Sequence, residues 1–141
     1  MQHLQVQTAG LGIADIDPFI AAVGTLTKLQ GLDLRGAMDC SYYTGATLDG
    51  LSRLQSLRLL DVSSCRIGSA CSVSLAKCLA KIMTVQNVDI SGNRLSYNGA
   101  HALAQMMKQK ACVEVLDLAG SSQMYNTECI QLAENFPFIN W

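Results

Sequence analysis

The chain has 141 residues, and its 10 basic and 11 acidic side chains give a formal net charge of −1. Half of the residues are hydrophobic and 15% are charged, which supplies a core for one domain and argues against disorder. Because no run of like charges occurs, we do not expect nucleic acid or a membrane surface as a partner. No signal peptide is visible, and no apolar stretch reaches the roughly 18 residues that span a bilayer.

The cysteines and histidines do not form a recognisable metal or cofactor site. No two of the six cysteines have the spacing C-x-x-C, and His3 and His101 lie far apart in the sequence. Three disulfides are one interpretation of an even number of cysteines. A core rich in Leu, Ala and Val does not need them, so we expect free buried thiols and a cytoplasmic protein.

Five short apolar segments recur along the chain at a constant interval. They are residues 4–6, 29–34, 57–62, 85–90 and 113–118. Four of them contain an aspartate, at positions 33, 61, 89 and 117, so each step is 28 residues. A constant period indicates a repeat architecture. We expect one domain of five repeats, at about residues 1–28, 29–56, 57–84, 85–112 and 113–140.

Each repeat starts with a strand pattern, continues with a polar turn and ends with a helix pattern. In the third repeat, Leu75, Leu79 and Ile82 form the apolar face of a predicted helix, and Lys77 and Lys81 lie opposite. Residues 42–48 of the second repeat are poor helix formers, which predicts a short or irregular helix. In the fifth repeat Pro137 ends the predicted helix.

The repeats resemble the ribonuclease-inhibitor type of leucine-rich repeat, L-x-x-L-x-L-x-x-N/C-x-L followed by a helix. The fourth repeat reads Val85-Gln-Asn-Val88-Asp-Ile90-Ser-Gly-Asn93-Arg-Leu95, and the third places Cys65 where the fourth has Asn93. The resemblance implies that this Asn or Cys side chain bonds the turn backbone of adjacent repeats. Ala9, Ala37 and Ser121 occupy the position in the other repeats, which weakens the ladder.

This resemblance implies an α/β solenoid, a right-handed superhelix with a parallel concave sheet and convex helices. Alternating strand residues then face the concave surface in rows. One row is Gln5, Asp33, Asp61, Asp89 and Asp117; a second is His3, Gly31, Leu59, Asn87 and Val115; a third is Gln7, Arg35, Ser63, Ser91 and Ala119. Arg58 lies at a strand entrance.

The aspartate row has two interpretations. It is either an acidic stripe that attracts Lys or Arg side chains of a partner, or a sequence that this repeat family tolerates because Arg35 and Arg58 are near. Metal binding is disfavoured, because a hard cation needs oxygens that converge on one point. Leu59 and Val115 are either binding hot spots or scattered surface hydrophobes.

The ends of the chain suggest a larger context. The first strand starts at Met1 without a capping segment, and residues 136–141 form an apolar tail that ends in Trp141. We expect a part of a longer protein or assembly. The alternative is that a partner or a second copy covers the ends, so that the chain self-associates.

The resemblance implies a protein–protein interaction module that binds a protein partner on the concave sheet or at the solenoid ends. The alternative is a structural subunit or segment of a larger complex without a separate groove. No phosphate loop or nucleophile–base pair is present, so we do not expect an enzyme. The candidate partner-binding residues are Asp33, Arg35, Arg58, Leu59, Asp61, Asn87, Asp89, Val115, Asp117 and Trp141.

Overall fold

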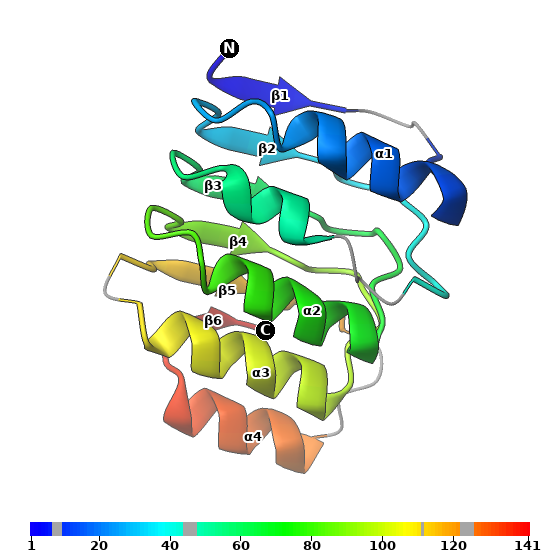
Figure 1. Ribbon diagram of the computed structural model, residues 1–141. Helices are drawn as coiled ribbons and strands as arrows, with labels where there is room; N and C mark the ends of the chain where they lie inside the picture. The colour runs from blue at the N-terminus through cyan, green and yellow to red at the C-terminus, as the bar shows by residue number, and fades with distance from the viewer. Residues whose placement is uncertain (7–9, 44–47, 111, 122–125) are drawn as a thin grey trace.

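The computed structural model describes residues 1–6, 10–43, 48–110, 112–121 and 126–141. Strands and helices alternate along the chain (Figure 1). The strands are β1 (His3–Gln5), β2 (Gly31–Asp33), β3 (Leu59–Asp61), β4 (Asn87–Asp89), β5 (Val115–Asp117) and β6 (Ile139–Asn140). The helical elements are α1 (Ile13–Val23), the 3₁₀ helix η1 (Leu48–Arg53), α2 (Ser69–Leu79), α3 (Tyr97–Lys108) and α4 (Asn126–Asn135).

The strands form one parallel sheet in chain order, from β1 to β6, and the helices cover one of its faces (Figure 1). From β1 to β5 each residue pairs with the residue 28 positions later, as in Leu4↔Leu32 and Leu32↔Leu60. Val88↔Leu116 continues the same register. The interval between the sequence repeats is therefore the register of the sheet, and the predicted fold class is confirmed.

The repeated leucine positions form the core between the sheet and the helices. In the middle of strands β2 to β5, Leu32, Leu60, Val88 and Leu116 are at most 2% exposed. Because side chains alternate along a strand, their neighbours on either side project from the opposite face. The sheet therefore has one apolar face under the helices and one open face.

Asn93 ties the third and fourth repeats together through their backbones. Its Oδ1 accepts the N–H groups of Cys65 and Ile67 at 3.0 and 2.8 Å. Its Nδ2 donates to the carbonyls of Val62 and Ile90 at 3.0 and 2.7 Å. Asn93 is 1% exposed, so these bonds satisfy polar groups inside the protein. The predicted asparagine ladder is confirmed here.

The other residues at the Asn93 position make fewer bonds. The Sγ of Cys65 donates to the Leu34 carbonyl at 3.1 Å and so also reaches the preceding repeat. The Ser121 Oγ donates to Leu118, within its own repeat. Ala37 is fully buried and brings only a methyl group. Ala9, together with Gln7 of the third surface row, lies outside the described residues.

The second and fifth repeats depart from the others where the sequence predicts it. In the second repeat η1 replaces an α-helix, although residues 44–47 of the predicted irregular segment lie outside the described residues. In the fifth repeat α4 ends at Asn135, two residues before Pro137. No helix in the described ranges combines the length and the apolar character that crossing a bilayer requires.

The C-terminal tail packs into the fold, which the repeat pattern did not predict. Phe136 is 2% exposed, and β6 pairs with β5 through Leu116↔Ile139. His101 of α3 lies partly buried between two aromatic rings. Its centroid is 5.4 Å from that of Tyr97 and 6.1 Å from that of Phe136.

Candidate partner-binding groove

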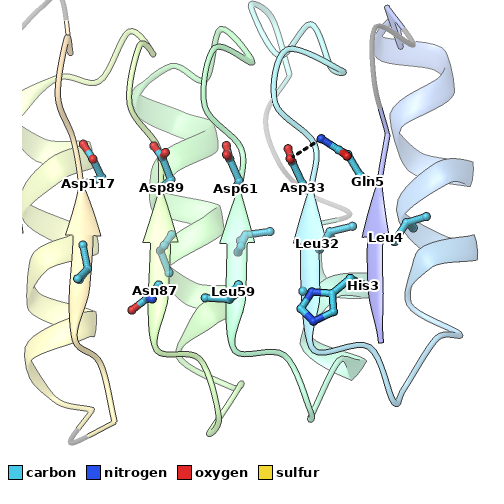
Figure 2. Close-up of a pocket in the computed structure, with 14 residues that line it drawn as sticks. His3, Leu4, Gln5, Leu32, Asp33, Leu59, Asp61, Asn87, Asp89 and Asp117 are labelled. Atoms are coloured by element: carbon cyan, nitrogen blue, oxygen red, sulfur yellow. Dashed lines mark hydrogen bonds between the residues drawn. The ribbon is translucent and has the colours of Figure 1, made fainter. Parts of the chain in front are cut away.

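The open face of the sheet carries a groove of about 680 Å³ that crosses β1 to β5 (Figure 2). The strands position its side chains, because alternate residues of each strand project from this face. None of the lining residues identified in the described part of the chain is Lys or Arg, and four are Asp. They are His3, Leu4, Gln5, Gly31, Leu32, Asp33, Leu59, Leu60, Asp61, Asn87, Val88, Asp89, Val115 and Asp117.

The four aspartates form one row across neighbouring strands (Figure 2). The Oδ1 atom of each accepts the backbone N–H of the residue two positions later, at 2.9 or 3.0 Å. These bonds close the turn that follows each strand, in the manner of an Asx turn. The aspartate row therefore has a structural role in every repeat that carries it. The donors are Arg35, Ser63, Ser91 and Ala119.

The second carboxylate oxygen of three of these aspartates accepts a bond from a side chain. Gln5 donates to Asp33 at 3.0 Å and Asn140 donates to Asp117 at 2.8 Å. Arg35 donates to the Oδ2 of Asp61 through Nη2 at 2.6 Å and through Nε at 3.1 Å. No described side chain makes such a bond to Asp89 of β4.

The Arg35–Asp61 pair changes the acidity of its members. Partial burial raises the pKa of Asp61, but hydrogen bonds from Ser63 and Arg35 outweigh burial, so the pKa lies below its ordinary value. The bond to Asp61 raises the pKa of Arg35. Asp61 is therefore a carboxylate at neutral pH and already has a cationic neighbour.

A row of uncharged residues lies beside the aspartates, two positions earlier on each strand. Leu59 is 41% exposed and Val115 is 40% exposed, so both present apolar surface to the groove. Asn87 lies between them in the strand register, and its Oδ1 is buried without a hydrogen-bond partner. The groove thus combines apolar side chains, an unsatisfied acceptor and carboxylates.

Comparisons with known proteins identify the same architecture. A family model for the leucine-rich repeat matches residues 53–70 and 81–104. No curated protein sequence matches the chain significantly. A solved structure titled "Leiomodin-1 Actin-Binding Site 2 (ABS2)" superposes with a TM-score of 0.68, covering 86% of this chain and 71% of that chain at 13% identity. The fold is a leucine-rich-repeat solenoid.

The leucine-rich-repeat sheet brings most of the candidate binding residues together. Three do not line the groove: Arg35 bonds Asp61 at its rim, Arg58 precedes β3, and Trp141 follows β6 with 36% of its surface exposed. Ser63 of the third surface row is buried, because its Oγ and its N–H both bond Asp61. The candidates inside the groove are Asp33, Leu59, Asp61, Asn87, Asp89, Val115 and Asp117.

Four of the cysteines lie in the core of the solenoid. Cys40, Cys65, Cys71 and Cys78 are free and at most 1% exposed. Burial raises the pKa of Cys78 to about 12, and hydrogen bonding to Cys71 together with burial raises the pKa of Cys40. A thiol nucleophile must ionise, which these environments oppose. Within the described ranges no cluster of three or more His, Cys, Asp or Glu is arranged to hold a metal ion.

One property of the groove was missed from the sequence. The pattern Leu-Asp-Leu predicts that the aspartates face the open surface, but it does not show that half of each carboxylate closes a turn. The sequence contained a signal for this bond, because an Asp at the end of a strand, followed within two residues by a turn with Ser or Gly, favours an Asx turn. This backbone hydrogen bond competes with solvent and with a partner for the aspartate side chain.

Proposed function

We propose that the chain is a protein–protein interaction module whose partner binds in the groove. The supporting observation is the combination of exposed Leu59 and Val115 with a row of carboxylates on a hydrogen-bonded sheet. A preformed surface loses little conformational entropy on binding. Apolar side chains at its centre contribute affinity, and the carboxylates contribute orientation and association rate.

The comparisons support a binding role for this fold. The similar leucine-rich-repeat structure is titled an actin-binding site, which makes its own partner a protein. The 28-residue period and the Asn93 bonds favour the ribonuclease-inhibitor type with five repeats. We infer that these repeats form one domain of a longer protein or assembly, and that it acts inside the cell.

Photo-crosslinking maps the partner surface directly. p-Benzoylphenylalanine is placed at Leu59 or Val115 in the groove, and at Lys77 or Gln105 on the exposed helix surface. After irradiation in a cell extract, we expect both groove positions to capture the same protein and both helix positions to leave it free. Mass spectrometry identifies the captured protein, and circular dichroism confirms that each variant is folded.

The same experiment distinguishes the structural alternative. In that case the contacts lie at the solenoid ends, so a crosslinker at Trp141 captures the partner and those at Leu59 and Val115 do not. Capture from Lys77 or Gln105 alone also contradicts binding in the groove.

A further inference from the structure

Strand β4 contributes two hydrogen-bond acceptors to the groove. Asn87 and Asp89 are two residues apart on β4, so their side chains project from the same face (Figure 2). In the register of the sheet, Leu59 of β3 and Val115 of β5 flank Asn87 on either side. Asn87 thus lies between two apolar side chains, whereas the neighbours of Asp89 are Asp61 and Asp117, whose negative charge strengthens the attraction for a cation.

Both acceptors have unused capacity. The Oδ1 of Asn87 is buried and has no hydrogen-bond partner. Asp89 accepts the N–H of Ser91 through Oδ1, but no described side chain donates to its second oxygen. A buried acceptor without a partner is unfavourable, so a ligand that donates to it gains the full bond.

The charge of the groove selects a cation. Its lining residues include four aspartates and neither Lys nor Arg, as far as the structure describes the chain. Arg35 at the rim is already bonded to Asp61. Of the other aspartates in the row, Asp33 accepts a hydrogen bond from the Gln5 amide, and Asp117 accepts one from the Asn140 amide. Asp89 is therefore the carboxylate best placed to receive a cation from outside.

We propose that Asn87 and Asp89 form a subsite for one arginine side chain of a protein partner. The guanidinium donates to the second carboxylate oxygen of Asp89 and, after a rotation of the Asn87 side chain that turns its buried Oδ1 toward the groove, to that oxygen. Its methylene stem packs against Leu59 and Val115. This inference rests on the proposed function, because it names the side chain that a partner places in the groove.

Arginine fits this arrangement better than lysine. The Cα atoms of residues two apart on a strand of a parallel sheet are separated by about 6.6 Å, so the two acceptors lie well apart. A planar guanidinium carries donors on opposite edges and reaches both acceptors. The donors of an ammonium group converge on one nitrogen, so lysine reaches one acceptor and leaves the other without a partner.

A titration followed by NMR tests the subsite with a defined probe. The ¹⁵N-labelled full chain is titrated at low salt with Nα-acetyl-L-arginine methylamide and, separately, with the matched lysine compound. We expect saturable shifts centred on the amides of β3, β4 and β5, with a dissociation constant on the order of millimolar for so small a ligand. The lysine compound binds at least threefold more weakly.

Two isosteric variants separate the subsite from general electrostatics. Asp89→Asn keeps an oxygen for the Ser91 N–H and removes the charge, and we expect at least fivefold weaker binding of the arginine probe. Asp49→Asn makes the same charge change on η1, outside the groove, where Lys81 already pairs with the carboxylate, and should leave binding unchanged. Well-dispersed spectra confirm that both variants are folded.

Three results would overturn the subsite: an equal loss in both variants, equal binding of the two probes, or shifts absent or centred outside β3 to β5. If the probe fails while Leu59 and Val115 still crosslink a partner, the interaction function stands and the arginine subsite is wrong. If crosslinking occurs only from the helices or from Trp141, the interaction function itself is wrong.

Discussion

Ser64 adopts a backbone conformation that glycine adopts at the equivalent position of three other repeats. Its φ is 56°, and Gly36, Gly92 and Gly120 have φ between 63° and 69°. A left-handed conformation destabilises the folded state by about 1–2 kcal/mol when the residue has a Cβ. Replacement by glycine removes this strain, but the greater freedom of glycine in the unfolded chain offsets about 0.5–1 kcal/mol of the gain in stability. We therefore expect Ser64→Gly to stabilise the fold by about 0.5–1 kcal/mol in urea denaturation.

The reverse change provides the control for Ser64. Gly92→Ala forces alanine into the left-handed region and brings its Cβ to 3.0 Å from the Ser64 Oγ, so it should destabilise by about 1–2 kcal/mol. If Ser64→Gly lowers the urea midpoint instead, the turn does not carry the strain that its φ implies.

Asp61 makes the stability of the fold depend on pH. Burial raises its pKa, but the hydrogen bonds from Ser63 and Arg35 lower it by more. The net pKa therefore lies below the ordinary value of 3.8. A carboxyl whose pKa is lowered by folding stabilises the native state above its unfolded pKa. That contribution disappears as the pH falls through the lowered pKa.

Asp61→Asn measures the size of this contribution. The substitution keeps an acceptor for the Ser63 N–H and removes the ion pair with Arg35, whose side chain is 65% exposed. Because solvent screens that pair, we expect wild type to be more stable by less than about 1 kcal/mol near pH 7. In urea denaturation the difference should shrink as the pH falls from about 4 to 2. A difference that widens in acid would contradict the assigned shift.

At the scale of elements, the Asn93 side chain is a polar link between the third and fourth repeats. Asn93→Ala leaves the N–H groups of Cys65 and Ile67 and two carbonyls without their partner inside the protein. Each of these four buried bonds contributes about 0.5–1.5 kcal/mol, so we expect a loss of about 2–6 kcal/mol by urea denaturation. Ser121→Ala removes one bond within a single repeat and should cost about 1 kcal/mol or less. Equal costs would contradict a linking role for Asn93.

Helices α2 and α3 approach closely through Gly99. A Cβ added at Gly99 would overlap the Oγ of Ser72, which is fully buried between the helices. We expect Gly99→Ala to destabilise by about 1–3 kcal/mol, the usual cost of overpacking a core.

A double-mutant cycle checks that the overlap is the cause. Ser72→Ala removes the Oγ and its bond to Ser69, so alone it should cost about 1 kcal/mol. In the Ser72→Ala background Gly99→Ala should cost markedly less than in wild type. Additive costs would show that the two side chains do not interact.

At the scale of the whole molecule, the sequence period predicts the sheet because the period and the register are the same quantity. Leu32, Leu60, Val88 and Leu116 recur every 28 residues and pair in that register. Strand β6 was missed because Ile139 lies 23 residues after its partner Leu116, so it falls outside the period. Periodicity also places the groove residues on one face, but the bonding of each carboxylate depends on turn geometry that the period does not contain.

Contacts in the solenoid are mostly between neighbouring repeats, so a local change should have a graded effect along the chain. Phe136 tests this, because it is buried at the end that β6 covers. Its ring lies 5.4 Å from the Lys108 Nζ and 6.1 Å from the ring of His101. Phe136→Ala removes a core aromatic ring, which costs about 3 kcal/mol or more.

Amide hydrogen exchange by NMR resolves where the stability of the Phe136→Ala variant is lost. The Leu118 N–H donates to Asn140 of β6 at 2.7 Å, and the Val62 N–H donates to Asp89 at 2.9 Å near the middle of the sheet. Because Phe136 packs against His101 of α3 and lies three residues before β6, we expect protection at Leu118 to fall much more than protection at Val62. An equal fall in protection at both amides would show that the sheet opens only as one cooperative unit. In that case the loss of packing at one end would lower the free energy of opening by the same amount in every repeat.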